Sequence, residues 1–124
     1  MSEEQTQKLE FAEERLDTAK FLFRNEMYQD AISRSYYSIF HSAKALLLEK
    51  DSDPKTHTGT ASELGQLYRK ELGKEMTREF SRIQEKRERA DYGELTEITK
   101  KETEEIIKSS EEFISKTKEI INQS

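Results

Sequence analysis

The chain has 124 residues, enough for one domain and too few for two, so we expect a single domain over residues 1–124. Its net charge of −5 argues against a general nucleic-acid binder, although a local basic patch is compatible with it. The absence of cysteine excludes disulfides, thiolate zinc sites and a cysteine nucleophile. With no apolar run that spans a bilayer and an acidic start, we expect a cytoplasmic protein that does not enter membranes.

The first half of the chain predicts two long helices. Apolar residues recur at alternating steps of three and four, which indicates a helix of about 20 residues that ends near Asn25. A second, more apolar helix is predicted from about residue 28 to about Lys50. It stops before Pro54, because proline disfavours helix in the residue that precedes it.

The second half predicts three further helices. Thr60 and Glu63 form the pattern of a capping box, so we expect a short helix from there to about Leu72. Gly73 separates it from a fourth helix, which Tyr92-Gly93 should end, and a last helix is expected over about 95–122. The prediction is an all-α, up-and-down four-helix bundle with an additional short helix.

Arg34 and His41 are the most informative pair of the second helix. Seven residues make nearly two helical turns, so the two side chains share a face, and Tyr37 and Lys44 lie close to their line. This face is too apolar for an ordinary solvated surface. An almost opposite stripe can face the core, and it consists of Tyr36, Phe40, Ala43 and Leu47. A homodimer about a two-fold axis is the simplest way to cover it, and brings two copies of the pair together.

Arginine and histidine suffice for RNA cleavage without a metal. A neutral imidazole can take the proton of a 2′-hydroxyl, and a guanidinium can hold the phosphate. We therefore take Arg34 and His41 as candidate catalytic residues. The plainer alternative is that Arg34 pairs with a carboxylate such as Asp30 and that His41 is an interface residue.

Four other residues are candidates for contacts with a substrate: Tyr37, Lys44, His57 and Arg87. Arg87 lies on the apolar line of the fourth helix, so a carboxylate, Asp91 or Asp30, should meet it, with Tyr92 packed over the pair. His57 either meets a phosphate, if its loop folds over the second helix, or caps the third helix. The two histidines lie in different elements and form no metal-site pattern, so neither a metal nor another cofactor is expected.

Three stretches together resemble the HEPN domain family of prokaryotic helical proteins: MYQDAISRSYYSIFHSAKALLLEK, DPKTHTGT and KRERADYGEL. Their order and spacing match across nearly the whole chain. The resemblance implies a helical bundle, frequent dimerisation and pairing with a small nucleotidyltransferase-type protein. Active members carry an arginine and a histidine with four to six residues between them, on a helix that faces a groove between subunits. Arg34 and His41 have six residues between them, the upper limit of this pattern.

The resemblance therefore predicts the HEPN half of a toxin–antitoxin or nucleotidyltransferase module that acts on or with nucleotides or RNA. In the enzymatic version the protein is a metal-independent endoribonuclease, with His41 as the acid or base and Arg34 as the phosphate ligand. The alternative is a catalytically inactive, dimeric interaction or nucleotide-binding module. Alanine substitution separates the two, because only the enzyme has a cleavage activity to lose.

Overall fold

The computed structural model describes residues 1–93 and 97–123, and in these ranges all regular structure is helical. The helices are α1 (Glu3–Arg24), α2 (Tyr28–Leu48), α3 (His57–Leu67), α4 (Arg69–Leu72), α5 (Lys74–Asp91) and α6 (Lys100–Asn122). No helix in the described ranges is long and apolar enough to cross a membrane.

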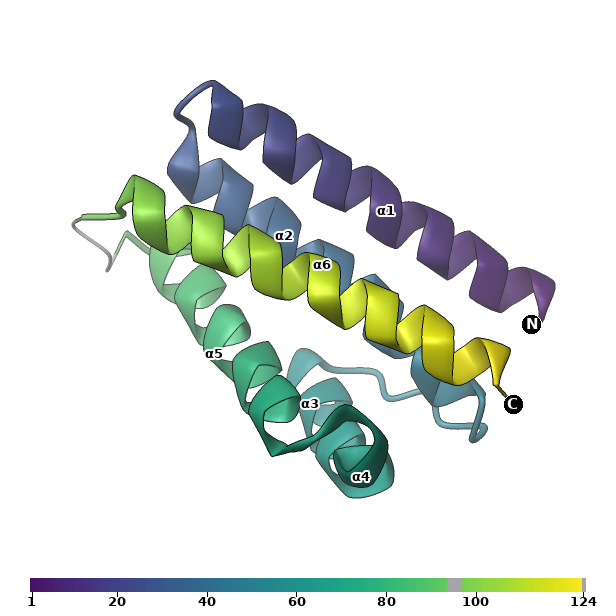
Figure 1. The fold of residues 1–124 in the computed structure, drawn as a ribbon. Helices are drawn as coiled ribbons and strands as arrows, with labels where there is room; N and C mark the ends of the chain where they lie inside the picture. The colour runs from purple at the N-terminus through teal and green to yellow at the C-terminus, as the bar shows by residue number, and fades with distance from the viewer. Residues whose placement is uncertain (94–96, 124) are drawn as a thin grey trace.

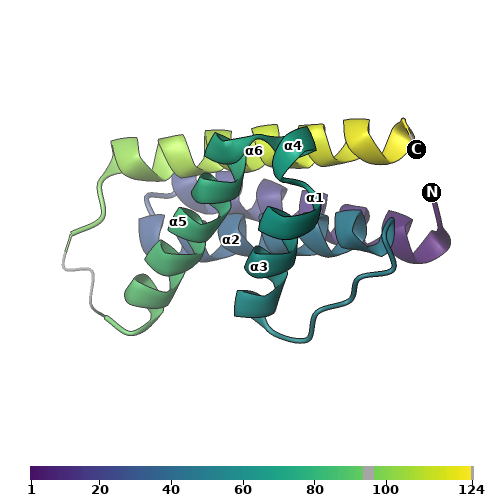
Figure 2. The ribbon, with the colours of Figure 1, turned by 90° about the horizontal axis from the view of Figure 1, so that it is seen from below.

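Three long helices lie side by side, and the others cross them. Figure 1 shows α1, α2 and α6 running along one another, with the two ends of the chain at the same end of the bundle. Figure 2 shows α3 and α5 crossing α2 at a steep angle, with α4 between them in the chain. The predicted all-α bundle of four long helices with an additional short helical segment is confirmed.

The helix α2 is the centre of the packing, since it contacts α1, α3, α5 and α6. Its side chains at Ile32, Tyr36, Ile39, Ala43 and Leu46 recur at steps of four and three and are at most 1% exposed. Full burial of one large apolar side chain contributes about 1.5–3 kcal/mol, so this stripe contributes several kcal/mol to the stability of the fold. Of the stripe predicted to face the core, Tyr36, Ala43 and Leu47 are fully buried, whereas Phe40 is half-buried and packs against the core.

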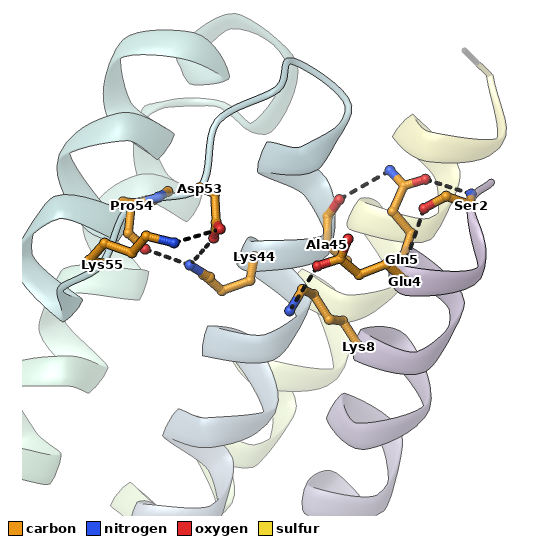
Figure 3. A network of polar contacts seen from close by, with 9 residues as sticks. All are labelled: Ser2, Glu4, Gln5, Lys8, Lys44, Ala45, Asp53, Pro54 and Lys55. Carbon is orange, nitrogen blue, oxygen red and sulfur yellow. Dashed lines mark hydrogen bonds and ion pairs between the residues drawn. The ribbon is translucent and has the colours of Figure 1, made fainter.

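A second apolar cluster joins α1 to α6. Ala12 and Ala19 of α1 are completely buried against Ile107 and Ile114 of α6. Alanine leaves room for the helix backbones to approach closely, and the isoleucines fill that space. Gln5 forms a polar contact between the start of α1 and the end of α2. Its side-chain amide donates to the Ala45 carbonyl at 3.2 Å (Figure 3). The same amide donates to the Glu49 carboxylate at 2.7 Å.

Two predicted boundaries in the middle of the chain are wrong. The capping box at Thr60 is not formed, because α3 begins one turn earlier, with Thr56 as its N-cap: the Thr56 hydroxyl accepts from the Gly59 amide at 2.8 Å. The predicted single helix to Leu72 is interrupted at Tyr68, whose φ of −129° is not helical. The Tyr68 ring is buried, and its hydroxyl donates to the Leu46 carbonyl at 3.1 Å.

The last helix also begins later than predicted. Thr99 is the N-cap of α6, and its hydroxyl accepts from the Glu102 amide at 3.1 Å. The predicted start near Leu95 lies outside the described residues. The predicted end of the fourth helix is confirmed: Tyr92 is the C-cap of α5, and Gly93 follows with a φ of 70°, a left-handed conformation that glycine adopts without strain.

The Thr56 cap gives a stability prediction. We expect Thr56→Ala to lower the free energy of unfolding by about 1 kcal/mol, because one amide of the first turn of α3 loses its acceptor. The control is Thr58→Ala, an exposed position in the same turn, which should change stability by less than about 0.5 kcal/mol. Urea denaturation measures both, and equal effects would contradict the assignment of Thr56 as the cap.

Candidate functional site

The two candidate catalytic residues lie on the same uninterrupted helix, α2, in different surroundings. Arg34 is exposed, and among the described residues its side chain has no ion pair or hydrogen bond, so it does not pair with Asp30. His41 is half-buried, with its ring centroid 5.8 Å from that of Phe11 on α1 and 5.7 Å from that of Phe40. Seven helical residues separate the two backbone positions by about 10 Å along the axis.

Two positively charged side chains of α1 lower the pKa of His41. The pKa of His41 is lowered from the usual value of 6.5, first by burial and then by the positive charges of Arg15 and Lys8. Both causes penalise the charged imidazolium. At neutral pH the imidazole of His41 is therefore uncharged, and this form is the one that can accept a proton.

A second cluster forms where α2, α3 and α5 meet. The hydroxyl of the fully buried Tyr36 lies 2.5 Å from Nδ1 of His57, and the His57 ring centroid lies 4.5 Å from that of Phe40. Burial raises the pKa of Tyr36 well above its usual value, so the hydroxyl keeps its proton. Donation of that proton to Nδ1 places the hydrogen of neutral His57 on Nε2. The pKa of His57 is lowered by burial and by Arg87, against the opposing charge of Glu88.

Arg87 completes the second cluster from α5. Its guanidinium carbon lies 5.0 Å from the ring centroid of Tyr36 and 5.6 Å from that of Tyr37, and one of its terminal nitrogens donates to Asp91 at 2.9 Å. Of the two carboxylates predicted as partners of Arg87, Asp91 forms the pair. The predicted packing of Tyr92 over this pair is wrong, since Tyr92 is 80% exposed and the tyrosines of α2 occupy that role.

Lys44 holds the loop that follows α2. Its ammonium donates to the Asp53 carboxylate at 2.6 Å and to the Pro54 carbonyl, while Lys55 pairs with the same carboxylate at 2.9 Å (Figure 3). These hydrogen bonds and charges hold the pKa of Asp53 at about 2. In this arrangement Lys44 fixes the path of the loop that leads to His57.

The clusters share the aromatic side chains of Tyr37 and Phe40. The Tyr37 ring centroid lies 6.5 Å from that of His41 and 6.4 Å from that of His57, and Phe40 contacts both imidazoles. The structure thus brings Tyr37, His57 and Arg87 together and places His41 on the other side of two shared rings. Arg34 lies about two turns of α2 away from His41.

The sequence analysis missed the contribution of α1. Phe11, Lys8 and Arg15 lie off the apolar stripe of that helix, so periodicity gives them no role. The available signal was Phe11 itself, an aromatic residue on the polar side of an amphipathic helix with arginine four residues later. No group of three or more histidine, aspartate or glutamate side chains suited to a metal ion occurs in the described part of the chain.

Comparison with known proteins places this chain in a family. Residues 7–120 match the family model for the HEPN domain. A protein named as a putative toxin from Methanocaldococcus jannaschii is 39% identical over 121 residues, which cover 93% of this chain and 87% of the relative. A second putative toxin of that organism is 36% identical, with coverages of 91% and 78%, and a UPF0332 protein of Thermotoga maritima is 33% identical, with coverages of 89% and 85%.

The surroundings of His41 give a testable pKa. We expect a histidine titration followed by NMR to place the pKa of His41 below 6.5, and Arg15→Gln to raise it, because one of the charges that disfavour imidazolium is removed. Burial remains, so the value should stay below 6.5. The control Arg24→Gln removes an exposed charge in the last turn of α1 and should leave the value unchanged. An unchanged pKa in Arg15→Gln would contradict the electrostatic account.

Proposed function

This chain belongs to the HEPN domain family, and from that premise we propose that it is the toxin of a toxin–antitoxin pair and cleaves RNA without a metal ion. The names of its relatives support a toxin role. The observation that carries the proposal is His41, an uncharged imidazole close to the charges of Arg15 and Lys8, on a helix that also presents Arg34, which has no ion pair among the described residues. These two groups suffice for metal-free RNA cleavage.

The proposed reaction uses the 2′-hydroxyl of RNA as the nucleophile. His41 takes the proton of this hydroxyl, and the 2′-oxygen forms a bond to phosphorus while the bond from phosphorus to the 5′-oxygen breaks. The products are a 2′,3′-cyclic phosphate and a 5′-hydroxyl end, which receives its proton from water. The guanidinium of Arg34 binds the non-bridging oxygens, where negative charge develops in the transition state.

The distance between Arg34 and His41 on one helix supports a homodimer in this proposal. On one α2 helix the backbones of Arg34 and His41 are separated by about 10 Å, a long distance for two groups that act on one phosphate. In a two-fold dimer formed by this face of α2, Arg34 of one subunit lies near His41 of the other. Arg34 is exposed and has no partner in residues 1–93 and 97–123, which is consistent with a role that is completed by a second copy.

Further residues take part as substrate contacts in the same proposal. Tyr37 lies between the two clusters and can position the RNA. His57 and Arg87, on the side of Tyr37 that faces away from His41, offer hydrogen-bond donors to the RNA. Lys44 can contact the substrate only when its ion pair with Asp53 opens. The antitoxin in this proposal is a small nucleotidyltransferase-type protein, and both act in the cytoplasm, where their RNA target lies.

A mixing experiment tests both the enzyme and the shared site. In EDTA, the wild-type protein should cleave transfer RNA to products with 2′,3′-cyclic phosphate ends, and Arg34→Ala and His41→Ala should each lose more than about 99% of the rate. When the two variants are unfolded together and refolded as mixed dimers, part of the activity should return, because one of the two sites in a mixed dimer has both residues.

Each alternative gives a different result in this experiment. If both residues act within one chain, the single variants are inactive and the mixture stays inactive. If the wild-type protein does not cleave RNA and His41→Ala changes its oligomeric mass, the face of α2 serves a binding module without catalysis. Circular dichroism of each variant controls for the loss of helical structure.

A further inference from the structure

Three side chains of α1 border His41 on the outside of the bundle. Lys8, Phe11 and Arg15 are spaced by three and four residues, so they lie on one face of the helix, which we call the α1 strip. Phe11 is 47% exposed although its ring contacts His41, and the Arg15 guanidinium lies 5.5 Å from the centre of the same ring. An exposed aromatic ring that is held between a cation and an imidazole is unusual on a solvated helix face.

The charge of the α1 strip is positive on a protein that is acidic as a whole. Lys8 and Arg15 form long ion pairs, 3.9 Å to Glu4 and 3.8 Å to Glu14, and both carboxylates are mostly exposed, so solvent weakens these two pairs. Arg34 on α2 adds a cation that has no ion pair or hydrogen bond within the described part of the chain. The charged groups that act on His41 are both positive. A ligand that covers this surface must therefore carry negative charge.

We propose that the α1 strip binds single-stranded RNA next to His41, with a base stacked on Phe11 and phosphates on Arg15 and Lys8. A base has an apolar face that can stack on an exposed phenylalanine. The phosphates of the adjacent backbone carry negative charge and can pair with Lys8 and Arg15. The base must be unpaired to reach the ring, so the strip selects single strands over duplexes. The place of this strip beside a cleavage centre rests on the proposed function, whereas RNA binding by the strip does not.

Binding of an uncleavable RNA tests the proposal apart from catalysis. The probe is a fluorescent single-stranded oligonucleotide with 2′-O-methyl groups, which has no nucleophile. We expect Phe11→Ala to weaken its binding about tenfold. The matched control is Phe21→Ala, which removes a phenylalanine of α1 that is 57% exposed and lies outside the strip, and it should leave the affinity unchanged. Arg15→Gln should weaken binding and lower the slope of log affinity against log salt by about 0.7, the value for one phosphate contact on a single strand.

The outcomes separate this inference from the proposed function. Weaker binding in Phe11→Ala supports the α1 strip even if the wild-type protein cleaves nothing. Equal binding by Phe11→Ala and Phe21→Ala overturns the inference even if cleavage is confirmed, and so does a duplex of the same sequence that binds as tightly as the single strand. Sedimentation of Phe11→Ala gives the remaining outcome, since a change in oligomeric mass with unchanged RNA affinity would make the strip a protein interface.

Discussion

Burial of one face of α2 is the constraint on which the arrangement of this protein depends. Because α2 contacts α1, α3, α5 and α6, its orientation about its own axis is fixed by side chains such as Tyr36 and Ile39 that are almost completely buried. The residues at the borders of that buried face can then reach only certain neighbours. Tyr37 and Phe40 lie at the border, and this places His41 on the α1 side and His57 on the α3 side of two shared rings.

Tyr36 shows how packing and polar contacts combine in this fold. Its ring contacts Phe80 of the core, with centroids 6.2 Å apart, while its hydroxyl fixes the imidazole at the start of α3 and its face lies against Arg87 of α5. A buried hydroxyl without a partner costs about 1–3 kcal/mol, so the contact with His57 favours one position of α3 against α2. The same side chain thus stabilises the bundle and sets the geometry of one half of the candidate site.

The protonation of the two histidines follows from this packing. Both imidazoles are partly buried and both have an arginine nearby, so the pKa of each is lowered and the neutral form persists below the pH at which a free histidine becomes charged. A histidine with a lowered pKa stabilises the folded protein most when it is neutral. That stability is lost as the pH falls through 6.5 toward the pKa in the folded state, because the unfolded chain then binds protons first.

The sequence was sufficient for what depends on spacing along one helix. The apolar period identified the side of α2 that carries Tyr36 as the core side, and the four-residue step gave Asp91 as one of two candidate partners of Arg87. Contacts between different helices could not be predicted from the sequence pattern. The contact of Phe11 with His41 depends on how α1 packs on α2, and that of Tyr36 with His57 depends on the path of a loop.

The prediction of Thr60 as the N-cap of the third helix was wrong because tertiary contacts decide where that helix begins. Thr56 and Thr60 are one turn apart and both suit an N-cap by residue type. The choice was made by tertiary structure: Thr60 is fully buried and its hydroxyl donates to the Thr56 carbonyl, which makes it part of the helix that Thr56 begins. Local sequence signals identified the turn of the chain and left open which of its two threonines starts the helix.

The pH dependence of RNA cleavage in EDTA tests the central claim most directly, that an uncharged His41 in a cationic setting is the base. The account predicts that kcat/KM rises with pH and levels off above an inflection below 6.5, at the pKa that NMR assigns to His41, and that the inflection moves upward in Arg15→Gln. An inflection that does not follow the titration of His41, or cleavage that requires a divalent metal, would contradict it.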